Sequence, residues 1–211
     1  MKPDTVMRAW QVQSLLLNYP DAELREQYPV GRRVAATLPD PLGIPLTTFL
    51  DHVDQTPSTE LAIDFVATFD QRKRCCPYLT YYAHGDTRNR GVALLKLKQS
   101  YARAGLLLRD DELPDHLSVL LEFAASDNYE RGLRMLTEHR AGLELLRLAL
   151  IDAESPWRHV LTSVSATLPA LRGDEREAVA KLAAQGPPEE QVGLAPFAPP
   201  EYMPESLGGP R

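Results

Sequence analysis

The sequence contains only two cysteines, and they are neighbours, Cys75 and Cys76. Adjacent cysteines rarely reach the geometry of a disulfide bond, so a disulfide-stapled secreted fold is not expected. They also lack the C-x-x-C spacing that is typical of zinc sites, and no metal site is expected. Because thiols without a disulfide framework are typical of reducing compartments, the sequence predicts a cytoplasmic protein.

Long apolar runs are also missing. The first ten residues, MKPDTVMRAW, hold no apolar stretch of signal-peptide length, and no segment is long enough to cross a bilayer. Arg32 and Arg33 resemble a twin-arginine export signal, but prolines interrupt the apolar residues that follow. We therefore expect a soluble protein that is not exported and has no stable membrane insertion.

Positive charge is scarce. The chain of 211 residues carries 29 acidic and 23 basic side chains, for a formal net charge of −6 at pH 7. A general nucleic-acid-binding protein needs a basic surface, so no nucleic-acid partner is expected. The basic run from Arg72 to Arg74 is short and has few interleaved aromatic residues on which bases could stack.

Strand-like alternation is absent, whereas apolar residues recur at the three- and four-residue spacing of helices. Trp157, Val160, Leu161 and Val164 are one such series. Turn residues and prolines mark predicted boundaries at 18–21, 28–29, 56–57 and 155–156. The pattern predicts an all-α fold, a compact single-domain helical bundle over residues 1–185.

The composition changes at Gly186. Residues 186–211 hold seven of the chain's 18 prolines and four of its 12 glycines. Such a segment cannot continue a helix and buries little apolar surface, which predicts a flexible, disordered C-terminal tail. Phe197, Tyr202 and Met203 leave open the alternative that the tail docks onto the body or onto a partner.

Familiar catalytic motifs are missing as well, since the chain has no G-x-S-x-G, no H-E-x-x-H and no P-loop. The unusual local chemistry gathers between residues 75 and 125. Three tyrosines at i, i+3 and i+4 place phenols on more than one face of a helix, and a polar turn with two arginines follows. The candidate binding residues in this block are Tyr78, Tyr81, Tyr82, His84, Asp86, Arg88 and Arg90.

A helix that begins after Asp86 or Thr87 would hold Arg88 and Arg90 in its first turn. Positive charge there opposes the helix dipole. Arginines that destabilise the start of a helix without a compensating local contact indicate a binding role. The alternative is that Asp86 caps the helix and pairs with one of the arginines.

A second polar cluster, from Glu112 to His116, precedes further apolar residues at helical spacing. With Leu113 as the cap and Pro114 as the first helical residue, Asp115 and His116 would occupy the second and third positions. We expect both beside the buried helix face, where the dipole disfavours a charge on His116 and Asp115 favours it. The alternative is that Asp115 only stabilises the helix end and His116 is exposed.

The sequence resembles the nitrate reductase delta-subunit family, the NarJ-type assembly chaperones, within the wider class of all-helical molybdoenzyme chaperones. The resemblance lies in LLLNYPDAEL (15–24), CCPYLTYYAHGDTRNRG (75–91), ELPDHLSVLLEFAA (112–125), HRAGLELLRLAL (139–150) and SPWRHVLTSVSATLP (155–169). These stretches are spread over most of the body and leave the tail uncovered. Pro77 departs from the family, which usually carries a leucine between the second cysteine position and the tyrosine.

The resemblance implies a cytoplasmic chaperone, not an enzyme, that binds the catalytic alpha subunit of respiratory nitrate reductase, including its N-terminal peptide. It implies that the chaperone keeps the apoenzyme competent for molybdenum-cofactor insertion and delays membrane docking, without binding a cofactor stably itself. It further implies that Asp115 and His116 contribute to peptide recognition, with Tyr19 and residues 78–90 as further groove residues.

The residues themselves are compatible with this role, because a helical peptide in a groove needs apolar walls and a few polar orienting groups. The net negative charge of the chain favours a basic peptide, with Asp86, Asp115 and Glu122 as candidate counter-charges. If His116 contacts the peptide, the affinity should change across its titration range, roughly pH 5.5 to 8.

Four alternatives remain open. The first is a chaperone of the same class that serves a different molybdoenzyme. The second is a small helical enzyme that uses Asp115 and His116 with a nucleophile from Cys75 or Tyr78. The third is a nucleic-acid-binding module that uses the arginines, and the fourth is a purely structural scaffold.

Overall fold

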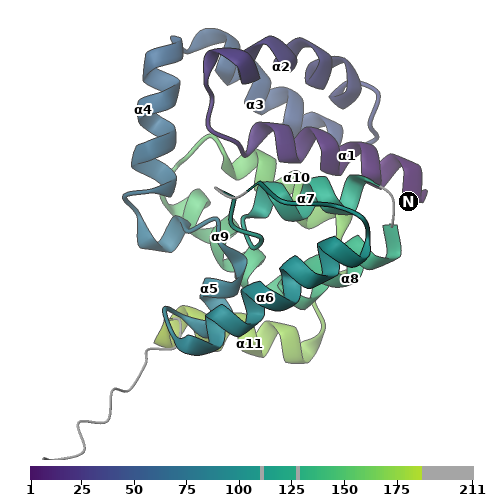
Figure 1. Cartoon of the computed structure of the whole chain (residues 1–211). Coiled ribbons are helices and arrows are strands. Elements are labelled where there is room, and N and C mark those ends of the chain that lie inside the picture. The colour runs from purple at the N-terminus through teal and green to yellow at the C-terminus, as the bar shows by residue number, and fades with distance from the viewer. Residues whose placement is uncertain (110–111, 127–128, 187–211) are drawn as a thin grey trace, which may run out of the picture.

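Apolar residues at helical spacing form helices along the whole computed structural model, which describes residues 1–109, 112–126 and 129–186 (Figure 1). The helices of these ranges are α1 (Pro3–Leu16), α2 (Ala22–Ala35), α3 (Gly43–Gln55), α4 (Ser58–Phe69), the 3-10 helix η1 (Lys73–Cys75), α5 (Leu79–His84), α6 (Arg88–Arg103), α7 (Leu117–Ser126), α8 (Tyr129–Glu138), α9 (Arg140–Asp152), α10 (Arg158–Thr167) and α11 (Gly173–Gln185). The all-α prediction is confirmed, since extended pairing in the described residues is limited to one isolated bridge.

Helix α1 lies at the centre of the bundle and packs against α2, α3, α7 and α10. Its buried polar groups bond to α10: the Trp10 indole donates to the Thr167 hydroxyl at 2.9 Å, and the Gln13 amide donates to the Ser163 hydroxyl at 2.8 Å. Polar groups taken out of water need such partners. These bonds therefore fix the two helices against each other in one register.

An aromatic cluster forms the core on the α3–α4 side of the molecule. Trp157 lies at the centre, with its ring 5.5 Å from Phe49, 5.6 Å from Phe65 and 5.5 Å from Phe69, measured between centroids. The Trp157 indole also donates to the carbonyl oxygen of Leu16 at 3.1 Å. Large aromatic surfaces dominate core energetics, so this cluster joins α3, α4 and the start of α10 to the end of α1.

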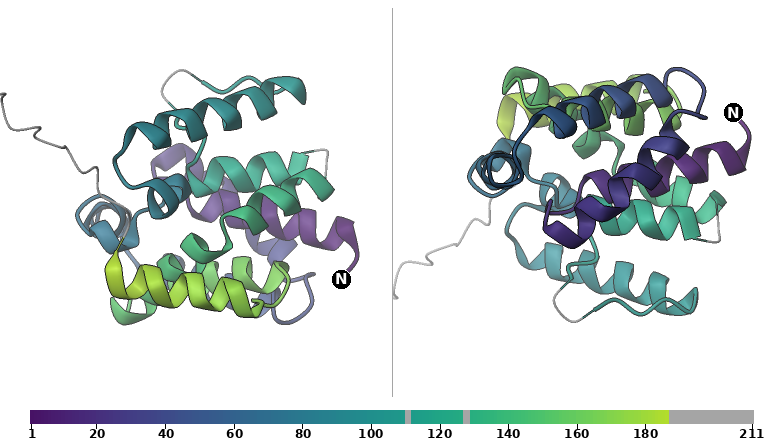
Figure 2. Two further views of the ribbon diagram at one scale, coloured as in Figure 1. Left: turned by 90° about the horizontal axis from the view of Figure 1, so that it is seen from below. Right: turned by 90° about the horizontal axis from the view of Figure 1, so that it is seen from above.

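Helix α6 lies at one edge of the bundle and α11 at the opposite edge, with α1 and α7 between them (Figure 2). Helix α7 packs against both α1 and α8, while α5 packs against α6 and α9. Helix α6 differs from its neighbours because its buried residues are limited to Leu97 and Tyr101. Its attachment to the rest of the chain therefore depends strongly on the polar contacts of the candidate site.

Some helix boundaries agree with those predicted from turn residues and prolines. Asp21 caps α2 by accepting a hydrogen bond from the Leu24 backbone N–H at 2.7 Å, and Pro57 directly precedes α4. At 155–156 the proline belongs to a turn, and α10 begins two residues later, at Arg158.

Pro29 was expected to mark a boundary, but it lies inside α2. Tyr28, Gly31 and Ala35 are buried along one face of this helix, and the position of Gly31 lies close to Val12 and Leu15. Packing of this face against α1 thus overrides the local preference of proline for a helix end.

The predicted tail, residues 186–211, falls outside the described residues from 187 onward, so the tail and the domain boundary at 185 stay predictions. In the described ranges, no helix combines the length and the apolarity that a membrane span requires.

Gly132 offers a test of the packing between α7 and α8. A Cβ atom at this position would lie 2.5 Å from both the Cα and the Cβ of Ala124. We expect Gly132→Ala to lower the free energy of unfolding by about 1–3 kcal/mol, the usual effect of overpacking. Urea denaturation followed by circular dichroism measures this change.

Gly91 in α6 is the matched control, because a Cβ there would meet nothing within 4 Å. Gly91→Ala should leave stability unchanged or raise it by up to about 1 kcal/mol, through better helix propensity. Equal losses in the two variants would contradict the close approach of α7 and α8.

Candidate binding site

Two segments that lie far apart in sequence meet in one isolated antiparallel β-bridge. The Leu79 backbone N–H donates to the carbonyl oxygen of Asp115 at 3.0 Å, and the Leu117 N–H donates to that of Pro77 at 2.9 Å. Tyr78 and His116 form the bridge between these bonds. The two polar clusters of the sequence therefore meet where α5 and α7 begin.

The Asp115 side chain is fully buried at this junction, with 0% exposure. Its Oδ2 accepts a hydrogen bond from the Thr80 hydroxyl and lies 3.4 Å from Nη2 of Arg90. Arg90 Nε also donates to the Thr80 hydroxyl oxygen at 3.3 Å. A carboxylate away from water needs such partners. Asp115 thus ties the start of α7 to α5 and α6, which does not fit the expected role of a surface counter-charge.

Arg90 connects the buried carboxylate to the surface. Its Nη1 lies 3.1 Å from Oδ1 of Asp86, whose side chain is 80% exposed. Its guanidinium carbon lies 5.8 Å from the ring centroid of Tyr78, within the range of a cation–π contact. The pairing of Asp86 with one arginine is therefore confirmed, although Thr87 takes the cap position of α6. Two carboxylates offset the unfavourable position of Arg90 in the first helical turn.

Helix α7 begins at Leu117 and not at Pro114, as the sequence had suggested. Pro114 and Asp115 form a turn instead, held by the bridge and by the Tyr101 hydroxyl, which donates to the Pro114 carbonyl oxygen at 2.7 Å. His116 is the residue before the helix, and its Nδ1 accepts from the Ser118 backbone N–H at 3.3 Å. The imidazole thereby does what a serine or aspartate side chain usually does at a helix start.

Burial lowers the pKa of His116 to about 4, and the nearby charge of Asp115 acts in the opposite direction. The ring packs edge-on against Tyr78, with the centroids 5.2 Å apart. His116 therefore stays neutral from roughly pH 5.5 to 8, and its titration lies below the range in which the sequence predicted a change of affinity. We call Tyr78, Arg90, Asp115 and His116 the bridge cluster.

The remaining residues of the 78–90 block differ in exposure. Tyr82 is buried, with its hydroxyl 3.1 and 3.0 Å from two backbone carbonyl oxygens of segment 74–76, so it supports the site from inside. Tyr81 is half-buried and packs edge-on against Tyr82. His84 is half-buried in the last turn of α5, and Arg88 is exposed at the first position of α6.

Two predicted residues lie apart from the bridge cluster. Tyr19 lies in the connection between α1 and α2, and its ring packs edge-on against Phe65 of α4 at a centroid distance of 5.6 Å. Glu122 is exposed on α7 and lines an apolar hollow further along that helix.

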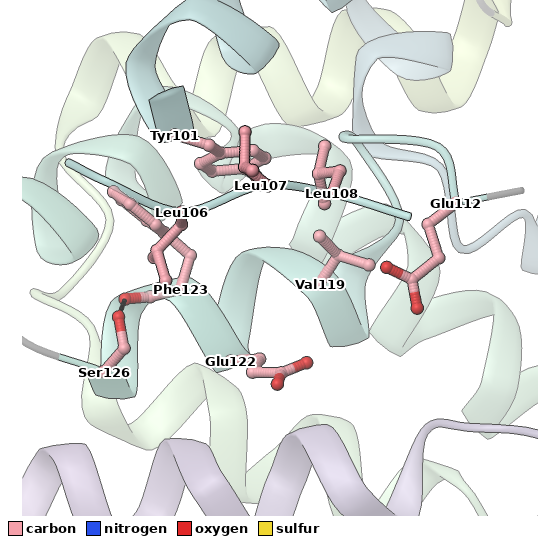
Figure 3. A pocket seen from close by; sticks show the side chains of 9 residues that line it. All are labelled: Tyr101, Leu106, Leu107, Leu108, Glu112, Val119, Glu122, Phe123 and Ser126. Atoms are coloured by element: carbon pink, nitrogen blue, oxygen red, sulfur yellow. Dashed lines mark hydrogen bonds between the residues drawn. The ribbon is translucent and has the colours of Figure 1, made fainter. Parts of the chain in front are cut away.

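This apolar hollow, which we call the leucine hollow, lies between the end of α6, the segment that follows it and α7 (Figure 3). It has a volume of about 130 Å³ and is lined by Tyr101, Leu106, Leu107, Leu108, Glu112, Val119, Glu122, Phe123 and Ser126. Leu107 is 92% exposed and Leu106 is 39% exposed. Neighbouring exposed leucines beside a hollow are typical of a surface that contacts a partner.

A glycine turn builds the leucine hollow. Gly105 follows α6 with φ of +80°, a conformation that residues with a Cβ rarely adopt. The Gly105 N–H donates to the Ala102 carbonyl and the Leu106 N–H to the Tyr101 carbonyl, both at 3.0 Å, which is the Schellman pattern. The chain thus reverses with Leu106 and Tyr101 in the same hollow, and the Tyr101 ring packs against Phe123 of α7.

Sequence reasoning missed the leucine hollow. It gave no binding role to Tyr101 or to residues 106–108. In the structure, Tyr101 joins the hollow to the bridge cluster, because its ring lines the hollow and its hydroxyl holds Pro114. Three consecutive leucines directly after a helix-ending glycine were the signal that could have revealed it.

The geometry does not support catalysis by Asp115 and His116. Among the described residues no hydrogen bond joins these two side chains: Oδ2 of Asp115 accepts from Thr80, and Nδ1 of His116 accepts from the Ser118 backbone N–H. Burial raises the pKa of the Cys75 and Cys76 thiols, which makes both of them poor nucleophiles. Across residues 1–109, 112–126 and 129–186, no group of three or more His, Cys, Asp or Glu could hold a metal ion.

The described residues form an all-helical bundle with an apolar surface hollow between the end of α6 and α7. The same fold occurs in a crystal structure from Archaeoglobus fulgidus, described as that of a redox enzyme maturation protein. The two structures align with a TM-score of 0.57 and 19% sequence identity, covering 76% of this chain and 91% of the other.

The sequence model of the nitrate reductase delta subunit family matches residues 35–163. The chain belongs to this family. The matched range contains the whole bridge cluster and the leucine hollow, and it leaves out Tyr19.

Three relatives illustrate the similarity. The nitrate reductase-like protein NarX of Mycobacterium tuberculosis is 35% identical over 158 residues, 75% of this chain, which spans only 24% of that protein's length. NarJ of Bacillus subtilis is 31% identical over 156 residues, 74% of this chain and 85% of the relative. NarJ of Escherichia coli K12 is 32% identical over 145 residues, 67% of this chain and 61% of the relative. Both NarJ proteins are named nitrate reductase molybdenum cofactor assembly chaperones.

The buried carboxylate can be tested by removing its charge while keeping its shape. Asp115→Asn should lower the free energy of unfolding by about 2 kcal/mol, because hydrogen bonds to charged groups contribute about 1.5–3 kcal/mol. Asp86→Asn is the matched control, since it removes the exposed carboxylate from the same arginine and should cost less than about 1 kcal/mol. Urea titration of both variants checks this, and equal losses would show that the buried network does not hold α6.

The depressed pKa of His116 predicts a specific pH dependence of stability. Between about pH 6.5 and 4 the unfolded chain binds a proton that the folded chain refuses, so the free energy of unfolding falls as the pH falls. At about pH 4.5 this single group should lower stability by about 2–3 kcal/mol relative to pH 7.

His116→Asn keeps a side-chain acceptor for the Ser118 N–H and removes the titrating group. The variant should therefore lose less stability than the native chain between pH 7 and 4.5, as measured by urea unfolding at both pH values. Burial also lowers the pKa of His139, so part of the decrease in the free energy of unfolding with falling pH remains in the variant. An equal loss of stability in the variant and the native chain between pH 7 and 4.5 would contradict the neutral, helix-capping state of His116.

Proposed function

We propose that this chain is a system-specific chaperone of the catalytic alpha subunit of a respiratory nitrate reductase. It binds the unassembled subunit, including its N-terminal peptide, supports insertion of the molybdenum cofactor and delays membrane docking until assembly is complete. The observation that carries the proposal is the match to 85% of the length of Bacillus subtilis NarJ, a protein named as a chaperone of this kind.

In this role the chain acts by binding and not by catalysis. The molybdenum cofactor belongs to the enzyme that is being assembled, and the chaperone holds no cofactor stably. At about 130 Å³, the leucine hollow is smaller than pockets for small-molecule ligands, about 300–1,000 Å³, and suits a side chain of a partner.

The leucine hollow supports recognition of an amphipathic helical peptide. Such a peptide places apolar side chains into a groove and leaves its polar face in water. Leu106 and Leu107 extend the apolar contact beyond the hollow, and Glu112 and Glu122 provide negative charge beside it. Carboxylates at the edge of an apolar surface favour basic residues in the partner and fix its orientation.

A second, more open hollow suggests the direction of the peptide. It lies at the start of α6 and includes Arg90 and Asp86 together with Leu94 and Leu113. Leu94 precedes Tyr101 of the leucine hollow by seven residues, about 10 Å along a helix at 1.5 Å per residue. A bound helix that runs along α6 would thus present apolar residues at i and i+7 to the two hollows. Tyr78 and His116 would orient it, while Asp115 and Tyr82 hold the site from inside.

The leucine hollow can be tested with a synthetic peptide of the alpha subunit's N-terminal segment. Leu107→Ser combined with Glu122→Gln should weaken its binding by about tenfold or more, because burying one leucine contributes about 1.5–3 kcal/mol. Calorimetric titration measures the affinity. Both side chains are exposed, so the fold should be unaffected, and circular dichroism checks this.

The matched control combines Leu95→Ser with Glu130→Gln, which changes the same residue types at exposed positions outside the hollow. Its affinity should equal that of the native chain. Equal weakening in both double variants would contradict binding at the leucine hollow.

Co-purification from cells tests the partner itself. The chain should capture the alpha subunit of nitrate reductase and lose most of this capture when the subunit's N-terminal segment is deleted. Capture of a different molybdoenzyme's catalytic subunit, with none of nitrate reductase, would contradict the assignment of the partner while keeping the class of function.

A further inference from the structure

The outer face of α6 is exposed, and the proposed peptide site does not use it. The buried residues of α6, Leu97 and Tyr101, face the bundle. On the opposite side of the helix, Val92 is 53% exposed and Leu95 is 60% exposed. These two residues are three positions apart, so their side chains lie next to each other on one face. We call Val92 and Leu95 the outer stripe.

Positive charge accompanies the outer stripe. Helix α6 carries five basic residues and no acidic residue, in a chain whose net charge is −6. Two carboxylates already pair with Arg90. Lys96, Lys98 and Arg103 are exposed, and none of them has a carboxylate within 4 Å among the residues that the structure describes. The outer face of α6 thus combines apolar side chains with cations that have no ion-pair partner in the described ranges.

The two lysines lie along the edges of the outer stripe. At about 100° per residue, Lys96 and Lys98 project on opposite sides of the face that holds Val92 and Leu95. Lysine can lay its methylene stem along an apolar surface while its ammonium group stays in water. Apolar residues with cations along both edges are typical of helices that lie in the plane of a membrane surface.

The place of α6 in the bundle makes this face accessible to a flat surface. Helix α6 lies at one edge of the bundle, and the outer stripe points away from the rest of it (Figure 2). The outer surface of a helix at an edge is convex. A bilayer can therefore meet the face along its length without a hollow to receive it.

We propose that the outer face of α6 binds reversibly to the surface of an anionic lipid bilayer. Val92 and Leu95 enter the boundary between headgroups and acyl chains, and Lys96 and Lys98 contact the lipid phosphates. Such a bilayer surface is negative over its whole area, which matches a helix that carries cations and no anions. Two apolar side chains are few, so the contact is peripheral and depends on charge.

This inference goes beyond the proposed chaperone function and does not depend on it. The peptide contacts proposed for α6 involve Leu94 and Tyr101, on the side of the two hollows, so a peptide and a bilayer could occupy the helix together. Failure to bind an N-terminal peptide would leave the lipid proposal standing, and failure to bind lipid would leave the chaperone proposal standing.

The test is co-sedimentation of the full chain with vesicles of phosphatidylcholine that contain about one-third phosphatidylglycerol. Binding should saturate as the lipid concentration rises. It should weaken as the ionic strength rises from about 0.05 to 0.5 M, because salt screens exposed charges. Vesicles of phosphatidylcholine alone should bind at least about tenfold more weakly. Equal binding to both kinds of vesicle, or no binding to either, would overturn the proposal.

Two double variants separate the roles of charge and apolar surface. Lys96→Gln with Lys98→Gln should weaken binding to the anionic vesicles by about tenfold or more, since each lysine near the surface adds to the attraction. Val92→Ser with Leu95→Ser should weaken it by about fivefold or more, because less apolar surface enters the bilayer. All four side chains are exposed, so circular dichroism should show an unchanged fold, and the affinity for the N-terminal peptide should stay the same.

Each variant has a matched control at exposed positions outside α6. Lys73→Gln with Lys181→Gln removes the same charges elsewhere, and Val30→Ser with Ile63→Ser removes exposed apolar side chains from α2 and α4. Both controls should bind the anionic vesicles as the native chain does. Equal weakening in a control and in its matched α6 variant would show that binding does not occur at this face.

The same apolar side chains could instead join two copies of the chain, and analytical ultracentrifugation without lipid separates the two cases. The lipid proposal predicts that the native chain and the variant Val92→Ser with Leu95→Ser sediment alike. A dimer of the native chain that this variant dissociates would assign the outer face to a second copy and overturn the proposal.

Discussion

The pairing of residues 77–79 with residues 115–117 is the constraint on which the candidate site depends. Two backbone hydrogen bonds bring the starts of α5 and α7 together, and the buried Asp115 carboxylate then bonds to Thr80 and Arg90. Helix α6 buries few apolar residues of its own, so this network and the Tyr101 hydroxyl fix its position. Both the leucine hollow and the more open hollow at the start of α6 exist because α6 is held there.

Sequence reasoning predicted what depends on local pattern. Helical spacing predicted the all-α fold, and a helix that begins after Asp86 or Thr87 was considered correctly, together with the pairing of Asp86 with an arginine. It failed where contacts between residues far apart in the sequence determine a helix boundary or the burial of a side chain. Pro114 looked like a helix start, but the bridge uses the backbone of Asp115 and Leu117, so α7 begins later. Neighbouring sequence also could not reveal that Asp115 is buried, because its partners come from two other helices.

The end of α6 separates two surfaces of opposite chemistry. Ser100 and Arg103 are three residues apart, share one face of the helix and line a polar hollow between α6 and α8. Tyr101 lies on another face, in the leucine hollow beside Glu112 and Glu122. In the proposed account, the surface beside Tyr101 takes the apolar and basic peptide of an unassembled enzyme. Tyr101 and Arg90 hold this helix at its two ends.

The central claim is that a partner peptide binds along α6 and α7, and amide hydrogen exchange tests it most directly. The chain should be measured alone and with a saturating N-terminal peptide of the nitrate reductase alpha subunit. The account predicts slower exchange in α6, in the described residues after it and in α7, with α3 and α4 unchanged. Protection centred on α3 and α4, or no protection at saturation, would contradict the account.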